Sequence, residues 1–244
     1  GYVDHEANTL CGPSTPMRIA SVSKPLTLAA LLKLIREGVG KLTASTKVVP
    51  YLGITAPKGQ TMDKRWNDIT VQHLIDHQGG FNRKTAAIRD PMFKSLEIAK
   101  ALGKNGAASP DDVIRYMAGQ PLQFAPGSAT EYSNFGYCLL GRVIEKASGK
   151  KYIDYLQSDI TQPIGATSIQ LGRSLKGPRN PKEPIYIDPN FDRNVFAPSS
   201  KVLVASPDGG FHLEAMDAHG GLVASAPDLT KFLNSYWMNG QPRK

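Results

Sequence analysis

The sequence has few or none of the features that mark disulfide-rich, membrane-spanning and metal-dependent proteins. Cys11 and Cys138 are its two cysteines, which are too few for a disulfide framework. No run of about eighteen apolar residues occurs, so we predict no membrane-spanning helix. The His-Glu-x-x-His motif of zinc hydrolases and the glycine-rich motifs of nucleotide-binding proteins are also missing. We therefore expect neither a metal nor another cofactor.

Two histidines are the exception to this lack of metal-binding patterns. His73 and His77 are four residues apart on a predicted helix, which is the spacing of a metal pair. The chain offers no clear third ligand, however. We interpret His73 as a packed side chain and His77 as a residue at a helix C-terminus, where the helix dipole favours a positive charge.

Other function classes are disfavoured on similar grounds. No Gly-x-Ser-x-Gly sequence occurs, which argues against an α/β-hydrolase. The net charge is +8, but the lysines and arginines are scattered through loops rather than gathered with aromatic residues, so we expect no nucleic-acid partner. We interpret these charges as a solvated surface, and attraction of anionic substrates or cell-wall polymers is the alternative.

The chain does contain enough apolar sequence for a sizeable core. Of its 244 residues, 41% are hydrophobic, and we find no repeat, low-complexity tract or interdomain linker. We therefore predict one domain over residues 1–244. The sequence begins at Gly1 and shows no signal peptide, so the compartment stays open, with a periplasmic or secreted location favoured if the protein is bacterial. The oligomeric state is not indicated.

One long apolar stretch predicts a buried helix near the start of the chain. Nearly every residue over 26–35 is apolar, which is typical of a helix buried on all sides. Alanine and leucine dominate this stretch, and both favour helices. Because Pro25 is tolerated in a first turn, the helix is expected to begin near Ser21, and Gly38 and Gly40 are expected to end it.

Ser21 and Lys24 make the start of this helix a candidate for chemistry. Because they are three residues apart, their side chains share one helix face. A serine hydroxyl is a poor nucleophile until a base removes its proton, and a lysine can be that base when burial or nearby cations lower its pKa. The alternative is a helix-capping serine followed by a lysine whose stem lies along the surface. A second Ser-x-x-Lys copy, at Ser148 and Lys151, has no buried helix behind it and is expected to be a solvated turn.

Tyr132-Ser133-Asn134 is the second candidate group, and we predict it on a loop between a Pro-Gly turn and an apolar helix. If lysines lower the pKa of Tyr132, its hydroxyl can act as a general base or acid. Asn134 carries both a donor and an acceptor, so it can orient Lys24 or a substrate amide. The alternative is a tyrosine that only makes a hydrogen bond within a turn.

The rest of the pattern predicts more helices than clear strands. Typical start signals, Ser109 before Pro110 and Asp68 or Thr70, precede two of the predicted helices. The predicted helices cover residues 70–77, 110–119, 137–147, 152–160 and 228–233, with a continuation to Met238 left open. Loops are expected over residues 42–66 and 81–108, and β-structure is favoured over residues 185–187 and 201–204.

Ser21, Lys24, Tyr132 and Asn134, in this order, are much more specific together than any one of them alone. With their surroundings, they make the chain resemble the class C β-lactamase and serine-esterase family, which also includes D,D-peptidases and the animal LACTB-type proteins. The resemblance covers nearly the whole chain and is carried by residues 17–24, 74–80, 132–141 and 220–229.

This resemblance implies a fold and a mechanism. The fold would be α+β and β-lactamase/transpeptidase-like, with an antiparallel sheet packed on helices beside a helical subdomain. Ser21 would be the acylated nucleophile, Lys24 its proton acceptor, and Tyr132 the base or acid that serves attack and the leaving group. Asn134 would position these groups. The expected substrate is a small ester, amide or β-lactam.

The third motif of the family, Lys-Thr-Gly or His-x-Gly on a sheet strand, is not clearly present. His219-Gly220-Gly221 has the letters, so His219 is a candidate for substrate binding, but it directly precedes the predicted helix at Asp228 and we favour a tight structural turn. Compared with the family, the chain is expected to lack the N-terminal hairpin and the C-terminal region that carries the third motif and the second oxyanion donor.

Two hypotheses about activity follow from these observations. The leading one is a serine hydrolase that acts through an acyl-enzyme on Ser21. An esterase is favoured over a β-lactamase because no Lys-Thr-Gly is present to hold a β-lactam carboxylate. The alternative is a non-catalytic protein that binds a ligand or assembles through the same fold.

Overall fold

The predicted central helix is α1 (Ser23–Arg36), which a 3₁₀ turn over Ala20–Val22 precedes. The computed structural model describes residues 1–236 and 241–243. Ala20 has a φ of 45°, so the chain turns sharply just before Ser21. The helix ends as predicted, since Gly38 adopts a left-handed conformation with a φ of 67° directly after it. The prediction of a buried helix that begins near Ser21 is therefore confirmed to within two residues.

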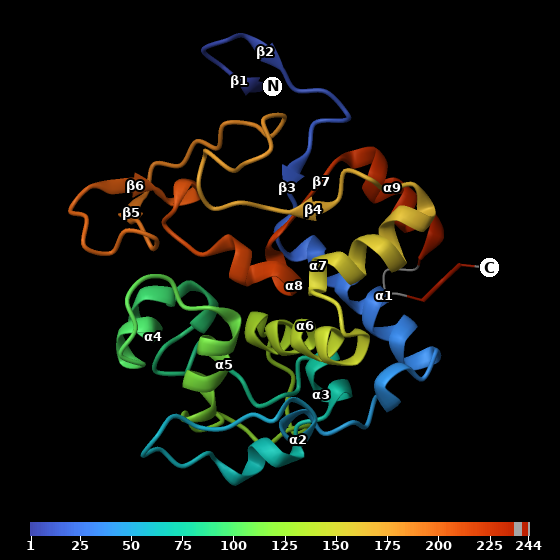
Figure 1. The fold of residues 1–244 in the computed structure, drawn as a ribbon, viewed down its shortest axis with the longest axis vertical. Coiled ribbons are helices and arrows are strands. Elements are labelled where there is room, and N and C mark those ends of the chain that lie inside the picture. Colours follow the sequence, from blue (N-terminus) through green and yellow to red (C-terminus); the bar gives the residue numbers. More distant parts are fainter. Residues whose placement is uncertain (237–240, 244) are drawn as a thin grey trace.

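Helices α6 (Asn134–Ser148) and α8 (Asp217–Gly220) pack against α1 at the centre of the molecule (Figure 1). A Cβ atom on Gly141 would lie 2.7 Å from the Cβ of Ala218, so only glycine permits this approach of α6 to α8. One cluster of buried apolar side chains runs through all three helices. Its members include Leu26, Leu31, Leu34, Phe135, Leu139, Leu140 and Ala218.

Short helices form the part of the molecule below α6 in Figure 1. Ser109 caps α5 (Pro110–Ala118) and Thr70 caps α3 (Val71–Ile75), each through its side-chain oxygen, as the sequence predicted. Helices α2 (Val48–Leu52) and α4 (Ser95–Ala101) lie in segments that were expected to be loops, so those two predictions were wrong. Both helices are short, and buried residues such as Val48 and Ile98 hold them in the common core.

An antiparallel sheet lies on the other side of α1 and α8, with the strand order β3-β7-β4. Strand β3 (Met17–Arg18) pairs with β7 (Leu222–Ala224), so that Met17 faces Ala224, and β4 (Gln170–Leu171) pairs with the opposite edge of β7. In the sequence, β3 leads directly into the 3₁₀ turn of Ser21, while β7 directly follows α8. The expected antiparallel sheet on helices, beside a helical part, is confirmed.

Further elements cover this sheet. Helix α7 (Tyr152–Tyr155) continues into a π-helical segment, Leu156–Thr161, and α9 (Ala226–Ser235) follows β7. The continuation of the last helix to Met238 lies outside the described residues. No helix in the described ranges is both long enough and apolar enough to cross a membrane.

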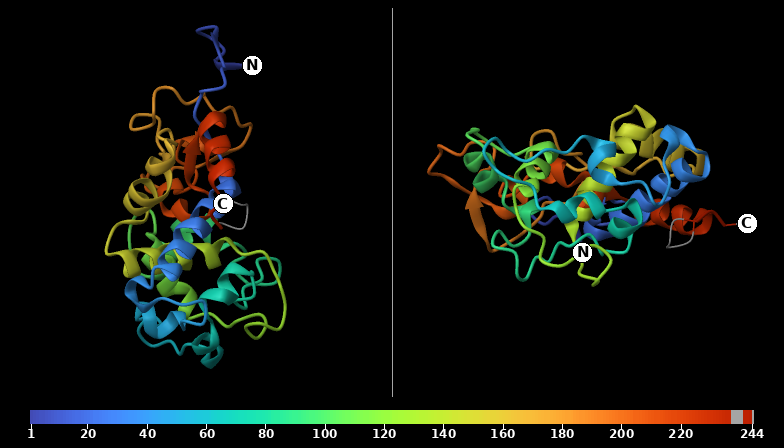
Figure 2. Two further views of the ribbon diagram at one scale, coloured as in Figure 1. Left: turned by 90° about the vertical axis from the view of Figure 1, so that its right-hand side faces the viewer. Right: turned by 90° about the horizontal axis from the view of Figure 1, so that it is seen from below.

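Two small hairpins extend from the body, as Figure 1 shows, and Figure 2 shows the N-terminal one in its left view and the other in its right view. One pairs β1 (Tyr2–Asp4) with β2 (Thr9–Leu10), and the other pairs β5 (Phe191–Arg193) with β6 (Leu203–Ala205). The β-prediction over residues 201–204 is thus partly correct. The prediction over residues 185–187 was wrong, because this segment docks through isolated bonds, such as that from the Ile185 amide to the Val3 carbonyl (2.7 Å), and forms no regular strand.

Candidate active site

The structure brings Ser21, Lys24, Tyr132 and Asn134 together, although two of them come from the start of the chain and two from its middle. Ser21 lies in the 3₁₀ turn and Lys24 in the first turn of α1. Tyr132 lies just before α6, and Asn134 is the first residue of that helix. The expectation that all of Tyr132-Ser133-Asn134 is loop was wrong, because the Ser133 side chain accepts a bond from the Gly136 amide and caps α6 at this point.

The Lys24 amine is the centre of the hydrogen-bond network. Lys24 is 5% exposed, and its Nζ lies within hydrogen-bond distance of four oxygen atoms. These oxygens are Tyr132 OH at 2.6 Å, the His219 carbonyl at 2.7 Å, Asn134 Oδ1 at 2.8 Å and Ser21 Oγ at 3.1 Å. The amine is therefore held from all sides while remaining in contact with the candidate nucleophile.

The Ser21 hydroxyl combines this contact with access to solvent. Its Oγ lies 2.5 Å from Tyr132 OH, and Ser21 is exposed whereas Lys24 is buried. Ser21 also lies in a first turn, where backbone N–H groups have no acceptor within the helix and can face an anion. A substrate arriving from solvent would meet Ser21 first and the amine behind it.

Burial makes the Lys24 amine easier to deprotonate. Desolvation lowers the pKa of its amine to about 8, because the charged form loses its hydration. The nearby Arg83 guanidinium lowers this pKa as well, while the Asp90 carboxylate raises it. Near neutral pH the amine is consequently much closer to losing its proton than an exposed lysine.

The short helix α8 supplies the backbone side of the site. The His219 carbonyl accepts from Lys24, and the Ala218 carbonyl accepts from the Thr27 hydroxyl at 2.6 Å. The imidazole of His219 is buried and has no hydrogen-bond partner at Nε2, and burial lowers its pKa to about 3. His219 thus joins the site through its carbonyl and lies on a short helix rather than in the tight turn that we favoured. A role for this residue in substrate binding stays a prediction.

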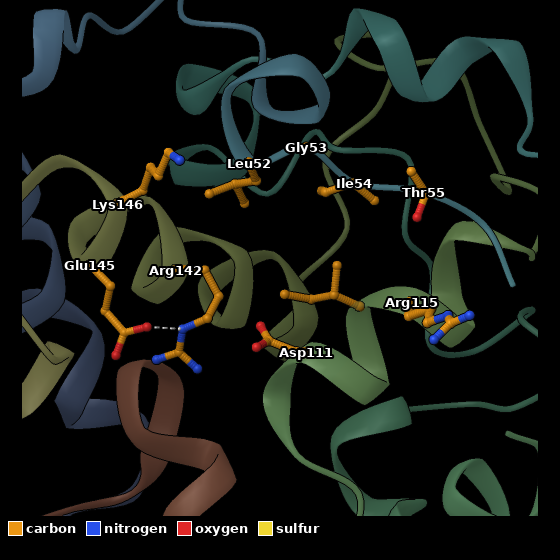
Figure 3. A pocket seen from close by; sticks show the side chains of 10 residues that line it. Leu52, Gly53, Ile54, Thr55, Asp111, Arg115, Arg142, Glu145 and Lys146 are labelled. Atoms are coloured by element: carbon orange, nitrogen blue, oxygen red, sulfur yellow. Dashed lines mark ion pairs between the residues drawn. The ribbon is translucent and has the colours of Figure 1, made fainter. Parts of the chain in front are cut away.

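An ion pair between α6 and α8 anchors those carbonyls. The Arg142 guanidinium lies 2.5 Å from Asp217 Oδ2, and its Nε forms an ion pair with Glu145 Oε2, 2.8 Å away. Figure 3 shows Arg142 and Glu145 at the edge of a cavity of about 490 Å³ between α5, α6 and the end of α2. None of Ser21, Lys24, Tyr132 and Asn134 lines this cavity, so we treat it as separate from the candidate site.

Three further side chains contact the site, and the sequence analysis did not assign them to it. The His77 ring packs against that of Tyr132, with 4.8 Å between ring centres, and its Nδ1 accepts from the Ser133 amide. Asp90 accepts from Asn134, and Arg83 lies over the Tyr132 ring. His77 belongs to a segment that carries the family resemblance, which was the available signal. Asp90 and Arg83 lie in a stretch without any recognisable pattern.

The two histidines with metal-pair spacing take different roles. His73 accepts a bond from the Thr70 amide within the helix cap, while His77 faces Tyr132. Within residues 1–236 and 241–243, no group of three or more His, Cys, Asp and Glu side chains is arranged to hold a metal ion. The second Ser-x-x-Lys copy ends α6 at Ser148, and Gly149 follows in a left-handed conformation, so the expected exposed turn is confirmed.

Comparison with curated proteins finds relatives that match nearly the whole chain. The serine beta-lactamase-like protein LACTB, mitochondrial, of Mus musculus is 28% identical over an alignment of 295 residues. The match covers 96% of this chain and 50% of that protein. Esterase EstB of Burkholderia gladioli is 29% identical over 165 residues, or 68% of this chain and 41% of the esterase. The chain thus spans about half the length, or less, of the curated relatives it matches.

Solved structures confirm the fold. D-amino acid amidase from Ochrobactrum anthropi SV3, complexed with L-phenylalanine amide, superposes with a TM-score of 0.67 over 96% of this chain and 59% of the amidase, at 22% sequence identity. The family model described as Beta-lactamase matches residues 1–244. With the antiparallel sheet on helices and the Ser-Lys-Tyr-Asn group already described, this match identifies the chain as a member of the beta-lactamase family of serine hydrolases, with the β-lactamase/transpeptidase-like fold.

Proposed function

We propose that this protein is a serine hydrolase that cleaves an ester or an amide through an acyl-enzyme on Ser21. Lys24 acts as the general base, Tyr132 transfers protons between the reacting groups, and Asn134 holds Lys24 in place. Membership of the family supports the reaction class, and the geometry of the four side chains supports the individual roles.

The contacts of Lys24 Nζ carry this proposal. Two of its four neighbours, Asn134 Oδ1 and the His219 carbonyl, can only accept hydrogen bonds. A neutral amine has two N–H groups and one lone pair. If its two N–H groups point to these acceptors, the lone pair is left facing the hydroxyls of Ser21 and Tyr132. The buried amine is thereby oriented as a proton acceptor for the serine.

The first half of the reaction follows from this orientation. Lys24 removes the Ser21 proton, directly or through Tyr132 OH, while Oγ attacks the substrate carbonyl carbon. The carbonyl π electrons move to the oxygen, and in this proposal the Ser21 backbone N–H donates to the oxyanion. When the tetrahedral intermediate collapses, the bond to the leaving group breaks. The leaving alcohol or amine takes a proton from Tyr132, which Lys24 reprotonates.

The second half reverses these roles with water as the nucleophile. Lys24 and Tyr132 remove a proton from water as it attacks the acyl carbon, and the ester bond to Ser21 breaks. Oγ takes the proton back, and the carboxylic acid leaves. The amine ends in its starting charge state, so one base serves both half-reactions.

Ester substrates are the first choice for testing this proposal. We would measure hydrolysis of p-nitrophenyl butyrate and of a chromogenic cephalosporin by the wild-type protein and by Ser21→Ala. Ser148→Ala is the matched control, because it removes the hydroxyl of the second Ser-x-x-Lys copy. The proposal expects activity that Ser21→Ala abolishes and Ser148→Ala retains, with the ester turned over faster.

The same assay identifies the alternatives. Faster turnover of the cephalosporin would assign the site to β-lactams. Equal background rates in wild type and Ser21→Ala would contradict catalysis and favour a non-catalytic protein that binds a ligand or assembles through this fold.

A further inference from the structure

The segment between α3 and α4 brings a carboxylate and a guanidinium next to the candidate site. Asn134 Nδ2 donates to Asp90 Oδ2 at 2.8 Å, and the Asp90 side chain is 14% exposed. The other Asp90 oxygen accepts from the Met92 amide at 3.1 Å and thereby caps the turn over Pro91–Phe93. Arg83 Nη1 lies 3.8 Å from Asp90 Oδ2, and its guanidinium carbon lies 4.9 Å from the Tyr132 ring centre.

We propose that Asp90 and Arg83 are positioning residues of the Ser21 site. Asp90 fixes the Asn134 amide with its oxygen toward Lys24, and Arg83 balances the Asp90 charge at the face of the Tyr132 ring. The predicted effects on turnover rest on the proposed function, whereas the predicted effects on the Lys24 amine do not.

The side-chain amide of Asn134 has two chemically different ends. Asn134 has an acceptor end and a donor end, and it lies between an amine and a carboxylate. An ionised carboxylate only accepts, so the NH₂ end of Asn134 faces Asp90 and the oxygen end faces Lys24. The flipped amide would place N–H against the Lys24 amine and oxygen against Asp90. Asp90 therefore decides which end of Asn134 reaches the catalytic amine.

Asp90 and Arg83 carry opposite charges and act on the Lys24 amine in opposite directions. Asp90 raises the pKa of Lys24 and Arg83 lowers it, while burial has the largest effect. Among the described residues, other polar and titratable groups face the amine from the elements packed around it. They are the hydroxyl of Ser21, the phenols of Tyr132 and Tyr137, and the imidazoles of His77 and His219. Among the described residues, Asp90 and Arg83 are thus the charges that act on Lys24, and their effects on its pKa have opposite signs.

Three variants separate orientation from charge. Asp90→Asn keeps an acceptor and a helix-capping side chain but removes the negative charge. Asp90→Ala removes both, and Arg83→Gln removes the positive charge. Lys84→Gln is the matched control, because Lys84 is a neighbouring exposed cation that pairs with Glu131, 3.9 Å away, rather than with a group of the site.

We expect opposite changes in the pH dependence of kcat/KM. The acid limb should move to lower pH in Asp90→Asn and to higher pH in Arg83→Gln, and it should not move in Lys84→Gln. Asp90→Ala should also lower the plateau value roughly 10- to 100-fold, the usual effect of losing an oriented hydrogen bond to a charged group. A merely structural role would reduce activity without moving the limb in two directions.

A direct titration makes the result independent of turnover. The ¹³Cε resonance of Lys24, assigned with Lys24→Met, reports the pKa of the amine in each variant. Shifts of that pKa in the same direction for Asp90→Asn and Arg83→Gln, or no shift in either, would overturn the inference, as would an unchanged plateau in Asp90→Ala. Opposite shifts in a protein without Ser21-dependent turnover would sink the proposed function and leave the positioning pair intact.

Discussion

At the scale of single residues, the site depends on the protonation of Lys24. The amine is surrounded by four oxygens but has at most three hydrogens, so its protonated form cannot donate to all four neighbours. Losing the proton leaves two N–H donors, one for Asn134 Oδ1 and one for the His219 carbonyl, which can only accept, and it frees the lone pair of the nitrogen. Burial favours the same change, since it lowers the pKa of the amine.

The pH dependence of kcat/KM tests this reasoning. In the proposed mechanism the neutral amine is the active form, so kcat/KM should rise with pH, pass its midpoint near the Lys24 pKa of about 8 and level off at higher pH. At pH 6 the neutral fraction, and with it kcat/KM, should be roughly one hundredth of the plateau value. The two nearby histidines cannot account for such a limb, because the pKa of His77 and that of His219 both lie below the ordinary histidine value. A limb centred near pH 6 would contradict Lys24 as the base.

Sequence reasoning could find the residues of the site that local patterns define. Ser21 and Lys24 are three residues apart at the start of one apolar helix, and Tyr132 and Asn134 lie at the start of another, so both pairs were recognisable. Asp90 is different, because it lies 44 residues before Asn134 in an irregular segment. Its contact with the site depends on how the turn over Pro91–Phe93 docks against α6, which no local spacing encodes.

At the scale of elements, the Arg142–Asp217 ion pair joins α6 to the helix that supplies the His219 carbonyl. Asp217 is buried, and this burial raises the pKa of its carboxyl, while Arg142 opposes the effect. Removing one partner of such a pair leaves an uncompensated buried charge, which costs far more than the intact pair contributes.

Arg142→Met is therefore expected to lower the free energy of unfolding by about 3–5 kcal/mol. Urea denaturation at constant pH measures this loss. Because the unpaired carboxyl would have a raised folded-state pKa, the native state would bind the extra proton, and the loss should be larger at pH 8 than at pH 5. Adding Asp217→Asn to Arg142→Met should recover part of the stability. A double variant less stable than Arg142→Met would argue against this explanation.

The elements that sequence patterns predicted differ physically from those they missed. Helices α1 and α6 are long and apolar, and α5 has a capping serine followed by proline, so each carries its own signal. Helices α2 and α4 are only five and seven residues long. Helices this short are marginal in isolation, and their stability comes from packing against the rest of the chain. Residues 185–187 show the reverse case, since β-favouring side chains there make an isolated bond to Val3 of β1 but join no sheet.

At the scale of the whole molecule, the two cysteines report on global unfolding. Cys138 lies in α6 with no exposed surface, and burial raises the pKa of its thiol to about 12. Cys11 is partly exposed near the N-terminal hairpin. Reactivity requires both access and a thiolate, so the two thiols should differ sharply in the native protein.

Thiol titration with a chromogenic disulfide should modify one cysteine per chain in buffer and two in guanidinium chloride. Cys11→Ser should abolish the fast reaction, and the slow reaction of Cys138 should follow the unfolding transition seen by circular dichroism. Fast modification of both thiols in buffer would show that α6 opens locally or that the central packing is looser than described.

The four contacts of Lys24 have a consequence for how preparations of this protein are judged. Its partners belong to the 3₁₀ turn, the segment before α6, α6 itself and α8, so the amine acquires its full environment only when all of these have docked. A molecule in which every helix has formed but α8 is displaced would have a normal helical circular-dichroism spectrum. Its Lys24 amine, however, would lack the surroundings that lower the pKa in the assembled site. Two samples of equal helix content can thus differ in their active fraction, and titration of Ser21, the proposed nucleophile, with an acylating reagent would count the correctly assembled molecules.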